Sequence, residues 1–543
     1  MSLRLADFIF LLLAALLCVA AYHGTWALSP SGVFMDSDLQ NYTQIFAARL
    51  VPGDFAHDPL VHTYKAFPGE PSLLTLLARL LEWGDGAVAA IFRAGALGIW
   101  LHLAAYYMLG RWLIKSPSLA ALLSLGMSVT IYWAFGTFWG ATHADPVPRI
   151  YYADLFPFWL MLGCAALRRP GLRPLLLFAI GLSIVVHSVS ALTCAAMFFA
   201  AFLLAPGGCS LPRHLENSAV TAGAFLLSAL PVLAVTMGHS VTSDSVHYAL
   251  FHEVWNMRAL ADWSDPWGDM GRILYHYLVR EPFLLFGLVC WIIARHVAGL
   301  SPRAQILLSM FPGFLLGLTG MLVLCLVEMT LAAKLGYSHV SQELLRGTRF
   351  LIPLCWLSIV CVLSLWWQRL PAVAHLAAPL GVVLLIGMIS QDKQVLAVRH
   401  SVAYTLGLPA LDSSRAAELM TAAGQYHQAL QALRELTSPC DLVFTDASDL
   451  AVRYVARRPL SPVAKDGWLL FYARDIELCQ RWLREQRAFN ADPLSVVNIW
   501  RENPARWLIT PNRPEVRAAL PPSSILFHNE GWIVAHKPSG TVN

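Results

Sequence analysis

Residues 5–42 decide the fold, and they read LADFIFLLLAALLCVAAYHGTWALSPSGVFMDSDLQNY. Residues 5–28 are almost entirely apolar, and about 20 such residues are enough for a helix to cross the hydrocarbon core of a bilayer. No clear small-residue cleavage site precedes Ser29, so we expect a retained helix and not a signal peptide. The acids Asp36 and Asp38 follow the helix closely. Ionised carboxylates accept protons or hold cations, so this motif is the first candidate for chemistry.

Similar apolar runs continue along the 543 residues, of which 57% are hydrophobic and only 13% are charged. This composition predicts a mainly α-helical, polytopic membrane protein. Besides 5–28, we expect spans at 88–113, 117–136, 151–167, 216–237, 281–298, 305–333, 350–367 and 371–390. The stretch 172–206 is too long for one span and short for two.

The distribution of basic residues resolves that stretch. Short basic loops occur at 111–115, 168–173, 295–303 and 368–369. All of them lie on the cytoplasmic side only if 172–206 crosses twice, with a break near His187. We therefore expect about eleven spans in a bacterial inner membrane. The N-terminus is predicted to be cytoplasmic and the C-terminus extracytoplasmic.

Three regions lie outside these spans. In the first external loop, 29–87, apolar spacing predicts helices on the membrane surface at 39–50 and 72–83. The second region, 239–280, is rich in His, Trp and Asp and contains Arg258, a candidate for substrate binding. The tail, 391–543, alternates predicted helices with short strands, so we expect a small α/β domain after a membrane domain at 1–390. The predicted elements of the tail are helices at 413–436 and 474–488 and strands at 442–444, 507–510, 525–527 and 532–535.

The acid pair has two interpretations. Ser37 and Gln40 have the spacing of a capping box, and acids near a helix N-terminus are stabilised by its dipole. One residue is enough for a cap, however, so catalysis or cation binding by Asp36 and Asp38 is an equal alternative. Together with Asp145 these acids could also hold a divalent cation in an oxygen-rich site. We expect no other metal or cofactor, because the ten cysteines show no metal-binding spacing. Cys440 and Cys479 of the tail could form a disulfide.

Cationic residues gather in other loops that are predicted to be external. His143, Asp145 and Arg149 lie between two spans, and His187 lies at the proposed break. Another pair, Arg346 and Arg349, precedes a span on the external side, against the usual bias of basic residues. Guanidinium groups make paired hydrogen bonds to phosphate oxygens, so we expect them to bind a lipid phosphate.

Each of these residues also has a purely structural alternative. Arginines at span ends can anchor a helix at the headgroups. Glu328, in the preceding span, could pair one of them. A histidine in an apolar stretch is often a core residue bonded to a carbonyl group.

This layout resembles the C-type membrane glycosyltransferases. That superfamily includes protein O-mannosyltransferases, aminoarabinose transferases of lipid A and oligosaccharyltransferase subunits. The resemblance rests on the first helix, the acidic motif with Tyr42, the surface helices, about ten further helices and an outer α/β domain. It implies transfer of a sugar from a polyprenyl-phosphate carrier to a glycan, lipid or protein acceptor of the envelope. It also implies that Asp38 or Asp36 is the base, that Asp145 matches a second acid, and that attack inverts the anomeric centre.

The sequence also bears on three other functions: nucleic-acid binding, transport and a scaffolding role. No basic tract, P-loop or GxGxxG motif is present, so nucleic acid is not an expected partner. A transporter or flippase of lipid-linked saccharides would be expected to show an inverted repeat and charges in mid-span, and we find neither. A non-catalytic scaffold of a polysaccharide assembly, with the tail as its docking module, stays open.

Overall fold

The computed structural model describes two compact units, each built from separate stretches of chain. We call residues 1–19, 96–238 and 263–396 the helical unit, and residues 20–95, 239–262 and 397–543 the mixed unit. The residues described are 5–538 without 29–31, 33–34, 36, 63–71, 130–146, 206–209, 238–246, 260–264, 276–281, 336–340, 390–392, 409–412 and 474.

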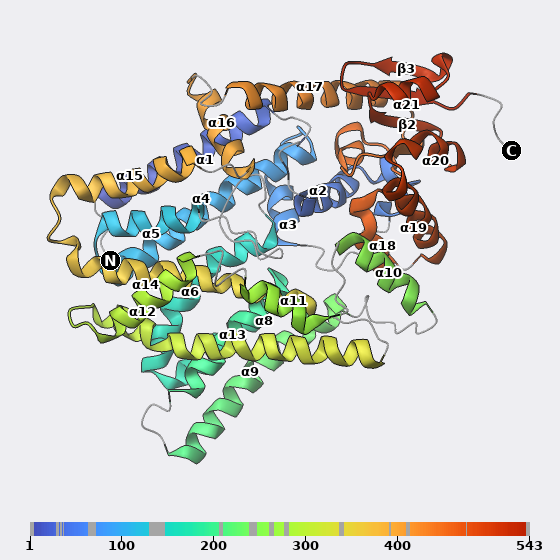
Figure 1. Ribbon diagram of the computed structural model, residues 1–543. Coiled ribbons are helices and arrows are strands. Elements are labelled where there is room, and N and C mark those ends of the chain that lie inside the picture. The colour runs from blue at the N-terminus through green and yellow to red at the C-terminus, as the bar shows by residue number, and fades with distance from the viewer. Residues whose placement is uncertain are drawn as a thin grey trace. The chain divides into compact units, whose positions relative to one another are not determined.

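The helical unit consists of the apolar helices that the hydropathy predicts (Figure 1). Six helices of the described residues are long and apolar enough to cross a membrane, as expected for a multi-pass membrane protein. The total of eleven crossings stays a prediction. Helices α1 (Leu5–Leu28) and α4 (Ala87–Ile114) run through a boundary between the units. The other helices are α5 (Pro117–Val129), α6 (Pro148–Arg168), α7 (Arg173–Leu182), α8 (Ser188–Leu203), α9 (Leu211–Met237), α11 (Pro266–Tyr275), α12 (Pro282–His296), α13 (Pro302–Leu335), α14 (Leu351–Trp367) and α15 (Ala372–Ile389).

The predicted break in 172–206 is confirmed. Helix α7 continues into a short 3-10 turn, η4 (Ser183–Val185), and α8 begins at Ser188 with His187 as its N-cap. Both helices are too short to cross a bilayer core in a perpendicular orientation. Backbone irregularity of this kind is tolerated at membrane depth where it is packed in protein or lines a cavity.

Close packing of α8 fixes the position of this break. A Cβ atom added to Gly313 or Gly317 of α13 would meet backbone atoms of α8 at 2.2 Å and 2.5 Å, so the two backbones are in direct contact. Glycines allow such close approach between membrane helices. A 3-10 segment, η6 (Gln342–Phe350), also packs on α8: a Cβ atom on Gly347 would lie 2.8 Å from Thr193.

The mixed unit contains the predicted small α/β fold. Four strands form a sheet in the order β1-β2-β4-β3, in which β1 and β2 are parallel and the other pairs are antiparallel. Its buried face includes Phe444, Leu508 and Ala535 on neighbouring strands. The strands are β1 (Val443–Thr445), β2 (Trp507–Pro511), β3 (Ile525–His528) and β4 (Trp532–His536).

Helices pack on this sheet, and the unit also contains residues between the first two predicted spans. The two long predicted helices are observed as α17 (Ser413–Leu436) and α19 (Ile476–Ala491). The remaining helices are α2 (Ser37–Leu50), α3 (Leu73–Leu80), α10 (Tyr248–Ala259), α16 (Lys393–Thr405), α18 (Gly467–Ala473), α20 (Val496–Glu502) and α21 (Pro514–Ala519). Short 3-10 or π turns include η1 (Pro52–Phe55), η7 (Val452–Ala456) and η8 (Ala464–Asp466).

The helix expected at 72–83 is present as α3 and is capped by Ser72 and Thr75. It buries Leu74 and Ala78, whereas Leu80 is 76% exposed. Trp83, just beyond the helix, is 72% exposed. An apolar face exposed in this way fits a helix that lies on a bilayer. Its contact with a membrane stays a prediction.

The disulfide considered for Cys440 and Cys479 is not formed, because both are free cysteines. Cys479 is buried in α19 with its Sγ 3.7 Å from the carbonyl oxygen of Leu470, whereas Cys440 is exposed. Burial raises the pKa of the Cys479 thiol to about 12, so this thiol is unreactive.

Candidate functional site

Helix α2 carries the candidate base Asp38 in its first turn, where the side chain is half-buried. The polar side chains of Gln40, Asn41 and Gln44 on the same helix are at most 4% exposed. Buried polar groups lose free energy unless they form hydrogen bonds, so the partners of this helix determine where it can lie. Asp36 lies outside the described residues.

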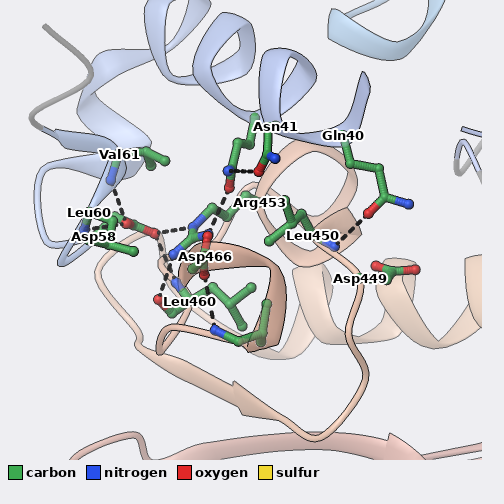
Figure 2. Close-up of polar contacts among 12 residues, drawn as sticks. Gln40, Asn41, Asp58, Leu60, Val61, Asp449, Leu450, Arg453, Leu460 and Asp466 are labelled. Atoms are coloured by element: carbon green, nitrogen blue, oxygen red, sulfur yellow. Dashed lines mark hydrogen bonds and ion pairs between the residues drawn. The ribbon is translucent and has the colours of Figure 1, made fainter. Parts of the chain in front are cut away.

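A buried ionic cluster supplies one of these partners (Figure 2). The guanidinium of Arg453, in η7, donates to Asp58 at 2.8 Å, to Asp466 at 2.7 Å and to the Gln44 oxygen at 2.7 Å. It also donates to the Leu460 carbonyl oxygen at 3.0 Å. The side chains of Arg453, Asp58 and Asp466 are fully buried, and the cluster joins α2 to the tail of the chain.

The charges in this cluster hold one another in place. Burial lowers the pKa of Arg453, but the carboxylates of Asp466 and Asp58 raise this pKa by a larger amount. The net pKa is raised, so the guanidinium stays charged. Burial raises the pKa of Asp466, an effect that Arg453 partly offsets. Three backbone N–H groups, of Leu60, Val61 and Leu460, also donate to Asp58. Removal of Arg453 would therefore leave buried charge without compensation.

Gln40 forms the second link. Its Oε1 accepts hydrogen bonds from the Leu450 amide at 3.3 Å and from the Lys465 ammonium at 3.0 Å. A capping box would instead turn this side chain back to the N-cap of α2. The capping box itself stays a prediction, and Gln40 and Gln44 together fix the helix that carries Asp38.

Four donor residues gather in the helical unit. Arg149 is the second residue of α6, and Arg346 and the buried Arg349 come from η6. His187 caps α8. His187 lies among the positive charges of Arg349, Arg149 and Arg346. Because its Nδ1 accepts a hydrogen bond at the cap of α8, the imidazole is neutral.

Local contacts hold η6 in this position. Ser341, next to its first residue, donates from its Oγ to Glu328 Oε2 of α13 at 2.6 Å. Its backbone N–H lies 3.4 Å from the same oxygen. Glu328, which the sequence offered as a partner of an arginine, accepts from Ser341, and its pairing with an arginine stays a prediction.

The remaining candidate residues are less informative. His143 and Asp145 lie outside the described residues, and Arg258 lies on α10. In the described part of the chain, no three His, Cys, Asp or Glu residues could hold a metal ion together. A cation held by Asp36, Asp38 and Asp145 stays a prediction.

Sequence reasoning missed a buried pair between α4 and α6. His102 Nδ1 lies 2.7 Å from Asp154 Oδ1, and both side chains are at most 8% exposed. Ionisable residues inside apolar helices are costly unless they are paired. Since Asp154 follows Arg149 by little more than one turn of α6, the pair also fixes the end of the helix that carries this arginine.

A comparison with solved structures confirms the expected resemblance at the level of the fold alone. ArnT from Cupriavidus metallidurans, in its crystal structure bound to undecaprenyl phosphate, is similar over 99% of this chain and 100% of that chain. The TM-score is 0.50 and the sequence identity 14%. The apo crystal structure of ArnT gives a TM-score of 0.47 at 13% identity, covering 98% of each chain. No model of a protein family matches the sequence, and no curated protein does.

Proposed function

We propose that this protein is a membrane glycosyltransferase that takes a sugar from a polyprenyl-phosphate donor and transfers it to an envelope acceptor outside the cytoplasm. The gathering of three arginines and a neutral histidine at the ends of apolar helices carries the proposal. Guanidinium groups gathered at the ends of apolar helices suit a phosphate ligand, and a lipid phosphate is the form in which a membrane supplies one. The full-length fold likeness to ArnT supports the same class of reaction.

The arginines would act on the leaving group. A lipid phosphate leaves as an anion, so the reaction needs stabilisation of charge more than a strong general acid. A well-placed donor to developing charge is typically worth ~3–4 kcal/mol. Arg349 fits this role best, because its side chain is only 2% exposed and Coulomb interactions are stronger where water is scarce.

Asp38 would act on the acceptor. A hydroxyl group becomes a better nucleophile when a carboxylate takes its proton, and general base catalysis typically contributes ~10²–10⁴-fold. The links from Gln40 and Gln44 to the tail hold the helix of Asp38 in one orientation. Catalytic groups on rigid elements lose less free energy when they adopt the reactive geometry.

The phosphate assignment is tested by replacing Arg349 with lysine, which keeps the charge and loses the paired geometry. Undecaprenyl phosphate should bind to the purified variant ~1–3 kcal/mol more weakly, as expected when hydrogen bonds to a charged group are lost. Arg303→Lys is the matched control, since Arg303 is exposed and donates to the Trp112 carbonyl oxygen. Unchanged affinity in Arg349→Lys and in the corresponding variants of Arg149 and Arg346 would reduce these residues to anchors.

The membrane orientation yields a separate prediction. A reporter enzyme that is active only outside the cytoplasm, fused after Asn543, should be active because the basic loops place the tail outside. A reporter that requires the cytoplasm should be inactive at the same position. The reverse pattern would reject both the orientation and the odd number of crossings.

A further inference from the structure

The hydrogen bonds of His187 determine its tautomer. As the N-cap of α8, its Nδ1 accepts from the Ser190 backbone N–H at 3.1 Å and lies 2.9 Å from the Ser190 hydroxyl. A backbone N–H can only donate, so Nδ1 must carry its lone pair. The proton of the neutral ring is therefore on Nε2.

The surroundings keep this state. Protonation of Nδ1 would break the cap of α8 and add a fourth positive charge beside Arg149, Arg346 and Arg349. Glu328, the acid of the adjacent α13, is bonded to Ser341. His187 therefore presents an Nε2–H donor without a charge.

Nε2 is available to a ligand. It lies on the side of the ring away from the α8 backbone, and the half-buried imidazole makes no hydrogen bond through it within the described residues. The neighbouring guanidinium groups are donors only. An oxygen of an anion can accept from the Nε2–H group and from such guanidinium groups alike.

We propose that His187 donates Nε2–H to a phosphate oxygen of the lipid-linked donor, as a fixed, uncharged donor beside the three arginines. This role rests on the proposed function and refines it. A neutral donor adds direction to phosphate binding without adding charge that would retain the phosphate product. In this role His187 binds the substrate through Nε2, and its Nδ1 caps helix α8.

Two substitutions separate the cap from the donor. In His187→Ser the side-chain oxygen still caps α8, but the Nε2–H donor is lost. In His187→Ala both the cap and the donor are lost. We expect the serine variant to keep the thermal midpoint of the wild type and the alanine variant to lower it. Undecaprenyl phosphate should bind about tenfold more weakly to both purified full-length variants. Wild-type affinity in His187→Ser would overturn the proposal and leave His187 as a cap.

Two further measurements test the charge state and the source of the phosphate. The ratio of wild-type to His187→Ser affinity should be constant between about pH 5 and 8, because titration of the ligand itself cancels. A ratio that rises below about pH 6.5 would show an imidazolium donor and overturn the neutral one. Inorganic phosphate should compete only weakly, and equal affinity would assign the site to free phosphate.

The arginine variants separate the two levels of inference. Weaker binding in Arg349→Lys with normal binding in His187→Ser would reject only the role of the histidine. Normal binding in both variants would reject the lipid-phosphate site itself.

Discussion

Replacing Arg453 by methionine is expected to lower the free energy of local unfolding around α2 by about 3–5 kcal/mol, the usual cost of removing one partner from a buried ion pair. Asp58 and Asp466 would then be buried without their guanidinium, and Gln44 would lose its donor. Hydrogen exchange of the α2 and η7 amides in the full-length protein measures this free energy directly.

Arg487→Met is the matched control, because it is the same change at an ion pair of the same unit that is exposed. The side chains of Arg487 and Glu253 are 57% and 40% exposed, and such pairs contribute only about 0–1 kcal/mol. Equal exchange rates in the two variants would contradict the importance of the buried cluster.

Asp38→Asn is expected to reduce sugar transfer by at least ~10²–10⁴-fold while leaving lipid binding intact. The amide has the shape of the carboxylate but cannot take the proton of an acceptor hydroxyl. Release of polyprenyl phosphate from the lipid-linked sugars of native membranes, catalysed by purified protein, measures the transfer.

Asp54→Asn provides the control, since Asp54 belongs to η1 in the same loop and the chemical change is identical. It should turn over at the rate of the wild type. If Asp38→Asn did so as well, Asp38 would be an ordinary residue of the first turn of α2.

The helices were predictable because burial in a membrane imposes a simple rule on composition. Runs of about 20 apolar residues predicted the long helices, and the asymmetry of basic loops predicted the break at His187. The strands of the tail were predictable from short β-branched and aromatic runs between turns. These signals are local, so one sequence is enough to read them.

The ionic cluster was not predictable, because its members carry no local signal. Asp58 lies in a Pro/Gly-rich stretch that reads as a surface loop, and Arg453 lies in the tail, 395 residues away. Charged residues are usually exposed, so a sequence predicts exposure for Asp58 and for Arg453. Their burial depends on their pairing, which only the folded chain brings about. The contacts of Gln40 with the tail were unpredictable for a similar reason, since its partners Leu450 and Lys465 are 410 and 425 residues away.

Arg453 follows Asp58 by 395 residues, so the two residues are synthesised at different times. At ~5–20 residues per second, a ribosome needs about 20–80 s to make the arginine after the aspartate. During that interval Asp58 and Gln44 lack the guanidinium group of Arg453. The helix that bears Asp38 therefore gains its contact with Arg453 only after the membrane helices have been made, and a chain interrupted before Arg453 would lack it.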